Sequence, residues 1–231
     1  MDRLTLGQSL NLSTDMIAAG RHNRSGRSMS PSHITIHNTS NTSAGADALA
    51  HARFVTQTGF YKINDRKHPV SWHYTVDDMR VVKHLPVNEV GFHAKSGNRR
   101  SIGIEICMHA GIDQNAANDR AARLVAALMH DLGILGAQVV THKHWTNKPC
   151  PKLLLTEFDA FVAAAQGHFD AILHDPTESF DPPDVLLTAE ELTAIRNFVD
   201  GGTEAIDDDT LEVEDPHPGT LDPETLQGPG V

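Results

Sequence analysis

The sequence from Val139 to Leu155 reads VVTHKHWTNKPCPKLLL, and it places a histidine and a cysteine eight positions apart in a short segment. Its first three residues are apolar or β-branched and predict the end of a buried β-strand. Pro149 and Pro151 restrict the backbone on both sides of the cysteine, so its thiol is held in place at little cost in conformational entropy. We therefore interpret His142 and Cys150 as candidate ligands of one metal ion.

Zinc is the metal that this pair of ligands favours. Zinc binds imidazole nitrogen and thiolate sulfur, and a catalytic zinc commonly has three protein ligands and one open position. The segment supplies two ligands, so the third must come from a distant histidine. The spacing alone is weak evidence, because histidine and cysteine also occur together in ordinary loops. A disulfide between Cys107 and Cys150, the two cysteines of the chain, is the competing use of the thiol.

The chain has 231 residues, which is enough for one domain of ordinary size with appendages. Its net charge of −11 belongs mainly to residues 201–231, which hold nine acidic residues and no lysine or arginine. The remaining 21 acidic and 19 basic residues leave residues 1–200 with a net charge of −2. A nearly neutral body without a basic face predicts no nucleic-acid binding.

Composition divides the chain into four segments. Residues 1–31 are polar and predict an irregular arm, and residues 32–174 predict the catalytic domain. Residues 175–200 predict a proline-rich linker and a short helix, in which Thr188 and Glu191 form a capping box. Residues 201–231 predict a disordered acidic tail. The short helix and the tail are candidate sites for a protein partner.

Apolar runs of the length of a membrane span or of a signal peptide are not found in the sequence. We therefore expect a protein made in the cytoplasm without a signal peptide.

Hydrophobic periodicity predicts an α/β domain with a central mixed sheet flanked by helices. We expect Leu49, Phe54 and Val55 to face the core from a helix capped by Ser43 and ended by Gly59. The expected strands are residues 33–37, 71–76, 81–85, 101–108 and a strand at 139–141, and the expected helices are 44–58, 115–132 and 154–174. The strands at 71–76 and 81–85 form an antiparallel hairpin in this prediction.

Five motifs occur in a fixed order between about residues 33 and 161: ITIHNTS, SWHY, GFHA, SIGIE and HKHWTNKPCP. In this order they resemble the zinc-dependent N-acetylmuramoyl-L-alanine amidases, a family that includes phage lysozyme-like amidases, bacterial recycling amidases and peptidoglycan recognition proteins. The resemblance implies hydrolysis of the amide between N-acetylmuramic acid and the L-alanine of the stem peptide, in peptidoglycan or in a muropeptide.

The resemblance also implies roles for particular residues. The zinc ligands of the family correspond to His37, His142 and Cys150, which adds the distant histidine that the loop requires. Glu105 corresponds to the glutamate that takes a proton from the attacking water. Lys148 corresponds to the lysine that stabilises the oxyanion.

Two further positions correspond to substrate-binding residues, His93 in the cleft and Asn98 as a weaker candidate. The sequence departs from the family at Trp72, where several relatives have a tyrosine before the histidine matched to His73. Tyr74 lies two residues further on, and we do not transfer the tyrosine's role to it.

Other interpretations remain open from the sequence. Glu105 in an apolar strand could form a buried salt bridge, and Lys148 could be a solvated loop residue. A peptidoglycan-recognition module without activity and a structural zinc site are alternatives to an enzyme. An amidase of this type could be a phage endolysin or an antibacterial effector that acts at the cell wall or in the periplasm, or a recycling enzyme of the cytoplasm.

Overall fold

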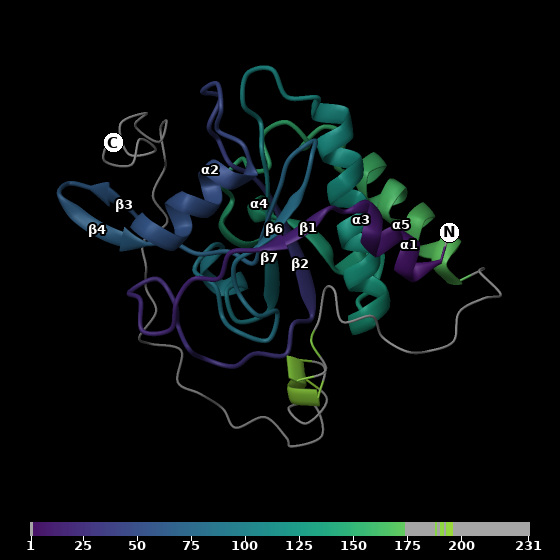
Figure 1. Cartoon of the computed structure of the whole chain (residues 1–231), viewed down its shortest axis with the longest axis horizontal. Helices are drawn as coiled ribbons and strands as arrows, with labels where there is room; N and C mark the ends of the chain where they lie inside the picture. Colours follow the sequence, from purple (N-terminus) through teal and green to yellow (C-terminus); the bar gives the residue numbers. More distant parts are fainter. Residues whose placement is uncertain (1, 174–187, 189, 192, 196–231) are drawn as a thin grey trace.

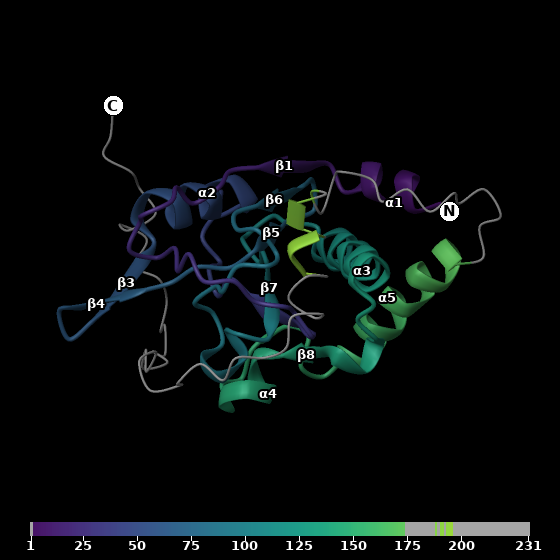
Figure 2. The ribbon, with the colours of Figure 1, turned by 90° about the horizontal axis from the view of Figure 1, so that it is seen from below.

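A six-stranded mixed sheet forms the centre of the protein in the computed structural model, which describes residues 2–173, 188, 190, 191 and 193–195. The strand order is β1-β6-β5-β7-β2-β8, in which β5 and β6 are antiparallel and all other neighbours are parallel. Helices cover the sheet on both sides (Figures 1 and 2). The predicted α/β fold with a mixed central sheet, and the predicted hairpin within it, are therefore confirmed.

The strands are β1 Leu12–Thr14, β2 His33–Asn38, β3 Phe60–Ile63, β4 Arg66–Pro69, β5 Tyr74–Val76, β6 Val81–Lys83, β7 Ser101–Ile106 and β8 Val139–Thr141. The α-helices are α1 Arg3–Ser9, α2 Ala48–Arg53, α3 Gln114–Leu132, α4 His142–Thr146 and α5 Phe158–Leu173. A π-helical turn, Phe54–Thr58, continues α2, and two short 3-10 turns are Lys95–Gly97 and Gly136–Gln138. Strands β3 and β4 form a separate two-stranded sheet.

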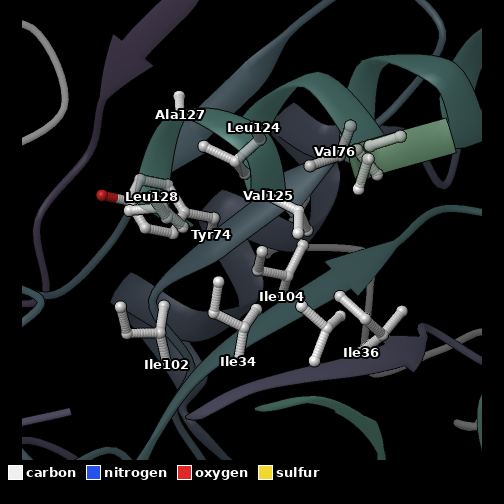
Figure 3. Packing of buried hydrophobic residues seen from close by; sticks show 14 of the residues in the cluster. Ile34, Ile36, Tyr74, Val76, Ile102, Ile104, Leu124, Val125, Ala127 and Leu128 are labelled. Carbon is white, nitrogen blue, oxygen red and sulfur yellow. The ribbon is translucent and has the colours of Figure 1, made fainter. Parts of the chain in front are cut away.

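The main core lies between the sheet and helices α3 and α5. Successive residues of a strand point to opposite faces, so the isoleucines of β2 and β7 share one face and pack against α3 (Figure 3). Ile34, Ile36, Ile102, Ile104 and Ile106 are all fully buried. Burial of each side chain stabilises the fold by about 1.5–3 kcal/mol. This face of the sheet therefore forms part of the core that stabilises the fold.

The alternate residues of the same two strands point to the other face of the sheet. They include His37 on β2 and Glu105 on β7. Helix α2 packs against β5 and β6 on this side. On the same side of the sheet, the carboxyl ends of β2 and β7 border a cleft.

Helix α2 is shorter than predicted at its start. It begins at Ala48 because Asp47, not Ser43, is its N-cap, with the Asp47 side chain accepting a hydrogen bond from the backbone N–H of Ala50. Gly59 ends the helical segment in the left-handed conformation with φ 64°, as predicted. Phe54 and Val55 are buried as expected, but Leu49 is 37% exposed, so its assignment to the core is wrong.

The prediction of a separate N-terminal arm is wrong, although most of residues 2–31 have no regular structure. Strand β1 adds to the sheet beside β6, and Leu6 and Leu10 lie in the main core. Arg3 of α1 forms a buried ion pair with Asp131 of α3, with 2.5 Å between the charged atoms. A few well-placed apolar residues bring the segment into the domain despite its polar composition.

The predicted capping box at Thr188 is confirmed, because the backbone N–H of Thr188 donates to Glu191 and that of Glu191 donates to the Thr188 hydroxyl. Glu191 also accepts from Lys83 Nζ at 2.8 Å and from the backbone N–H of Val87 at 3.1 Å. Ile195 packs against the main core. The capped segment is therefore docked on the domain. The predicted linker at 175–187 and the predicted tail at 201–231 lie outside the described residues.

Among the residues that the structure describes, no helix has the length and apolar character needed to cross a membrane.

Candidate metal centre and cleft

The three predicted metal ligands lie together at one end of the sheet. His37 is near the end of β2, His142 is the first residue of α4, and Cys150 lies beyond that helix. Strand β8 pairs with β2 so that Thr141 lies beside Ile36, which brings His142 next to His37. One ligand atom from each of the three residues lies within 4.8 Å of the others, and all three side chains are buried.

The spacing of these atoms fits zinc. The Cys150 Sγ and the His37 Nδ1 are 3.8 Å apart. Tetrahedral zinc, with bonds of about 2.1 Å to nitrogen and 2.3 Å to sulfur, requires about 3.6 Å between two such ligands. A buried set of two imidazoles and one thiol therefore has both the chemistry and the size of a zinc site.

Part of the predicted loop is helical. The Thr141 side chain caps α4 by accepting a hydrogen bond from the backbone N–H of His144 at 3.2 Å. The helix ends at Thr146, and its C-cap Asn147 has a left-handed backbone with φ 63°. Proline restriction alone thus does not hold the cysteine, because a capped helical turn fixes the chain between His142 and Cys150.

Glu105 lies directly beside His37 in the pairing of β7 with β2. Its Oε1 is 3.9 Å from His37 Nδ1, and its side chain is 16% exposed. No lysine or arginine forms an ion pair with Glu105 in the described part of the chain, and its Oε2 has no hydrogen-bond partner there. Burial raises the pKa of Glu105 to about 8, and the positive charge of Lys148 opposes this rise. The carboxyl group thus lines the cleft beside His37, with no salt bridge of the predicted alternative kind.

Lys148 lines the same cleft as Glu105 and the three candidate ligands. Its backbone carbonyl accepts a hydrogen bond from the N–H of Cys150 at 2.7 Å, so the lysine and the cysteine are held in one tight turn. The pKa of His37 is well below its ordinary value because of burial and nearby charges, among them Lys148. A lysine side chain is therefore present in the same cleft as the three candidate ligands.

His93 contacts the Nε2 side of the His37 ring, whereas Cys150 lies near the Nδ1 side. His93 Nε2 is 3.2 Å from the backbone carbonyl of Ser101, and its Nδ1 is 3.0 Å from His37 Nε2. Burial lowers the pKa of both histidines well below the ordinary value, so both rings are neutral. A carbonyl can only accept, so His93 carries its hydrogen on Nε2 and accepts from His37 Nε2–H. His37 Nδ1, the atom near Cys150, is left with a lone pair for a metal.

The position of His93 is fixed by its neighbours. A Cβ atom on Gly103 would lie 2.8 Å from the His93 ring, so only glycine leaves room for the ring at that place on β7. Asn98 Oδ1 accepts from the backbone N–H groups of His93 and Ala94, at 2.9 and 2.6 Å. Both His93 and Asn98 line the cleft. Their substrate-binding roles stay predictions. Their observed contacts are with the protein itself.

Trp72, where the sequence departs from the expected tyrosine, also lines the cleft. Its indole N–H donates to the Thr75 hydroxyl at 2.7 Å, so the ring offers only its carbon surface to a ligand. Tyr74 is fully buried among the residues of the main core. Neither side chain supplies a hydroxyl to the cleft.

One wall of the cleft was not predicted from the sequence. It includes His51 and Phe54, which follow each other at helical spacing, and Tyr61 of the β3–β4 hairpin. A signal for the hairpin exists at Asn64 and Asp65, which both have positive φ and lie between two short strands. The cleft-facing role of the hairpin has no comparable signal in the sequence.

Comparison with known proteins gives consistent matches. A family profile described as N-acetylmuramoyl-L-alanine amidase matches residues 27–153. The amidase XlyA of Bacillus subtilis strain 168 is 46% identical over 165 residues, or 68% of this chain and 52% of the relative. The amidase CwlH of the same strain is 41% identical over 158 residues, or 66% of this chain and 60% of the relative.

A solved structure of a mutant endolysin from Bacillus subtilis is 44% identical, with a TM-score of 0.62 over 68% of this chain and 99% of that chain. The chain spans between 52% and 60% of the length of the two curated relatives.

Proposed function

Because the chain belongs to the N-acetylmuramoyl-L-alanine amidase family, we propose that it hydrolyses the amide bond between N-acetylmuramic acid and the L-alanine of the stem peptide. The substrate is peptidoglycan or a soluble muropeptide. The observation that carries this proposal is the buried set of His37, His142 and Cys150 with the carboxyl group of Glu105 beside it. A recognition module would need the cleft but neither of these features.

In this proposal the two histidines and the thiolate of Cys150 hold one zinc ion. Zinc, when bound, supplies Lewis acidity that polarises the scissile carbonyl and lowers the pKa of water. Three protein ligands leave one position open, which favours a catalytic over a structural site.

The side chains around the three ligands perform the proton transfers and hold the charge. Glu105 takes a proton from the attacking water on a carboxylate oxygen and gives it to the leaving amine of L-alanine. Lys148 stabilises the negative charge on the lactyl carbonyl oxygen in the transition state. His93 is a positioning residue, because its hydrogen bond holds the His37 ring with Nδ1 toward the other ligands.

The proposed biological role is degradation of the bacterial cell wall, as an endolysin or an antibacterial effector. The similarity to a structure described as an endolysin favours this role over muropeptide recycling. We propose the cell wall or the periplasm as the site of action.

Product analysis tests the reaction. The zinc-loaded full chain is incubated with a soluble N-acetylmuramoyl-pentapeptide, and the products are identified by mass spectrometry. We expect free N-acetylmuramic acid and a peptide with L-alanine at its amino terminus. Cys150→Ala serves as the matched inactive protein. Binding of the intact substrate without cleavage would identify a recognition module instead.

A further inference from the structure

Helix α4 controls the position of two of the three candidate ligands. His142 is the first residue of this helix. The backbone N–H of Lys143, the next residue, donates a hydrogen bond to the backbone carbonyl of Cys150 at 3.1 Å, so the cysteine is tied to the helix. The third ligand, His37, lies on a different element, strand β2. The spacing of the three ligands therefore depends on how α4 is held against β2.

A hydrogen bond between two side chains joins these elements. The indole N–H of Trp145 on α4 donates to Oγ1 of Thr35 on β2 at 2.8 Å. Thr35 precedes His37 by two residues, so both side chains leave the same face of the strand. Thr35 is fully buried, so water does not compete for its hydroxyl group. The contact thus connects the strand that bears His37 directly to the helix that carries the other two ligands.

The same hydroxyl group belongs to a longer chain of hydrogen bonds. Thr35 donates to the hydroxyl of Ser101 at 2.8 Å, and Ser101 donates to the backbone carbonyl of Gly97 at 2.8 Å. Because an indole N–H can only donate and a carbonyl can only accept, both hydroxyl hydrogens have a single possible direction. Thr35 is therefore needed both as an acceptor and as a donor.

The Trp145 ring is also held by packing. A Cβ atom on Gly97 would lie 2.8 Å from three atoms of the five-membered part of the indole, so glycine leaves the room that the ring occupies. The ring of His33 meets the indole edge-on, with centroids 5.3 Å apart. These contacts fix the orientation in which the indole N–H points at Thr35.

From these contacts we propose that Thr35 and Trp145 are positioning residues of the candidate metal centre, whose hydrogen bond sets the distance between His37 and the two ligands held by α4. Zinc requires its ligands at a nearly fixed spacing, so the loss of this contact lowers zinc affinity. The backbone N–H of Leu153 also donates to Asn38 of β2, at 2.9 Å, and holds the segment on the far side of Cys150. Affinity should therefore fall without being abolished. This inference rests on the zinc site of the proposed function.

Zinc affinity of the full chain, measured by competition with a chelator, tests the proposal without any substrate. Valine has the shape of threonine but lacks the hydroxyl, whereas serine keeps the hydroxyl and loses the methyl group. We expect Thr35→Val and Trp145→Phe each to weaken zinc binding by about tenfold, and Thr35→Ser to stay within about twofold of the wild type. A role in packing alone gives the opposite order, because serine leaves a small cavity and valine does not. Lys143→Ala, an exposed change on the same helix, is the matched control and should bind zinc as the wild type does.

The double variant Thr35→Val/Trp145→Phe tests whether the two residues act through one contact. Its zinc affinity should be close to that of each single variant, because both changes remove the same hydrogen bond. Additive losses, or weaker zinc binding by Thr35→Ser than by Thr35→Val, would overturn the proposal. Circular dichroism verifies that each variant is folded. If zinc affinity depends on Thr35 and Trp145 as expected but soluble muropeptide is not hydrolysed, the positioning contact stands and the proposed amidase function fails. A wild-type protein that binds no zinc overturns both.

Discussion

His37 and Glu105 are register partners in the parallel pairing of β2 with β7, and His37 Nδ1 lies 3.9 Å from Glu105 Oε1. The side chains of both residues leave the same face of the sheet. A slip of one residue in this register would turn one of them toward the main core, because side chains alternate between the faces of a strand. Ile36 before His37, and Ile104 and Ile106 on either side of Glu105, would leave the core in such a slip, so the core fixes the geometry of the candidate site.

The first prediction concerns metal content. Purified protein should contain one zinc ion per chain, and Cys150→Ala should remove it because a thiolate ligand is lost. Cys107→Ala is the matched control, since Cys107 is also fully buried but is not part of the ligand set. Elemental analysis of the three proteins measures the effect. Full zinc content in Cys150→Ala would exclude the cysteine as a ligand.

The second prediction assigns the proton acceptor. Glu105→Gln retains the size of the side chain but cannot take a proton, so kcat on soluble muropeptide should fall by about 10² to 10⁴. Zinc content should stay at the wild-type level, and KM should change little. Lys148→Ala should lower kcat by a smaller factor, on the order of 10². Turnover at the wild-type rate in zinc-loaded Glu105→Gln would show that another group is the base.

The third prediction tests His93 as a positioning residue. Without its hydrogen bond to His37, the His37 ring is free to rotate, so His93→Phe should weaken zinc affinity by about 10- to 100-fold. Gly103→Ala should act in the same direction because its Cβ would crowd the His93 ring at 2.8 Å. Competition with a zinc chelator measures both. A substrate-binding His93 would instead raise KM and leave zinc affinity unchanged.

The fourth prediction uses the raised pKa of Glu105 in metal-free protein. Its pKa of about 8 in the folded state exceeds the ordinary value of 4.5, so the folded protein holds this proton more tightly than the unfolded chain does. The stability from the protonated form is complete below pH 4.5 and is lost as pH rises through about 8. Metal-free wild type should therefore lose more stability over this range than Glu105→Gln, by at most a few kcal/mol. Urea denaturation at several pH values gives the comparison, and parallel curves for the two proteins would contradict it.

The fifth prediction concerns the docked segment. Lys83 and Glu191 are both about nine-tenths buried, and removal of Glu191 takes its carboxylate away from the buried Lys83 ammonium. Glu191→Ala should lower the free energy of unfolding by about 3 kcal/mol. Glu190→Ala, one residue earlier and exposed, should change it by less than about 0.5 kcal/mol. Equal stability of the two variants would show that the segment does not stay docked in solution.

The strands and helices with strong periodicity were predictable from the sequence. The alternation in HITIH and the apolar spacing of residues 115–132 gave β2 and α3 nearly to the residue, because local patterns determine such elements. The N-terminal segment was not predictable in this way. Its contribution depends on Leu6 and Leu10 reaching a core that other parts of the chain build.

The three candidate ligands could be identified from the order of the motifs and from the ligand chemistry of histidine and cysteine, because both can be read from the sequence. The environment of His93 was not accessible from the sequence, since it depends on Ser101 and Gly103 across a strand pairing. For the same reason, the sequence did not predict that the β3–β4 hairpin lines the cleft. Contacts between distant segments leave no periodic pattern.

The alternation of β6 has a consequence for how this domain can be joined to others. Val81 and Lys83 face the side of α3 while Val82 faces α2, so Glu191 and Ile195 are docked behind the sheet, on the side away from His37 and Glu105. Any module fused directly after Ile195 starts its path from that rear face.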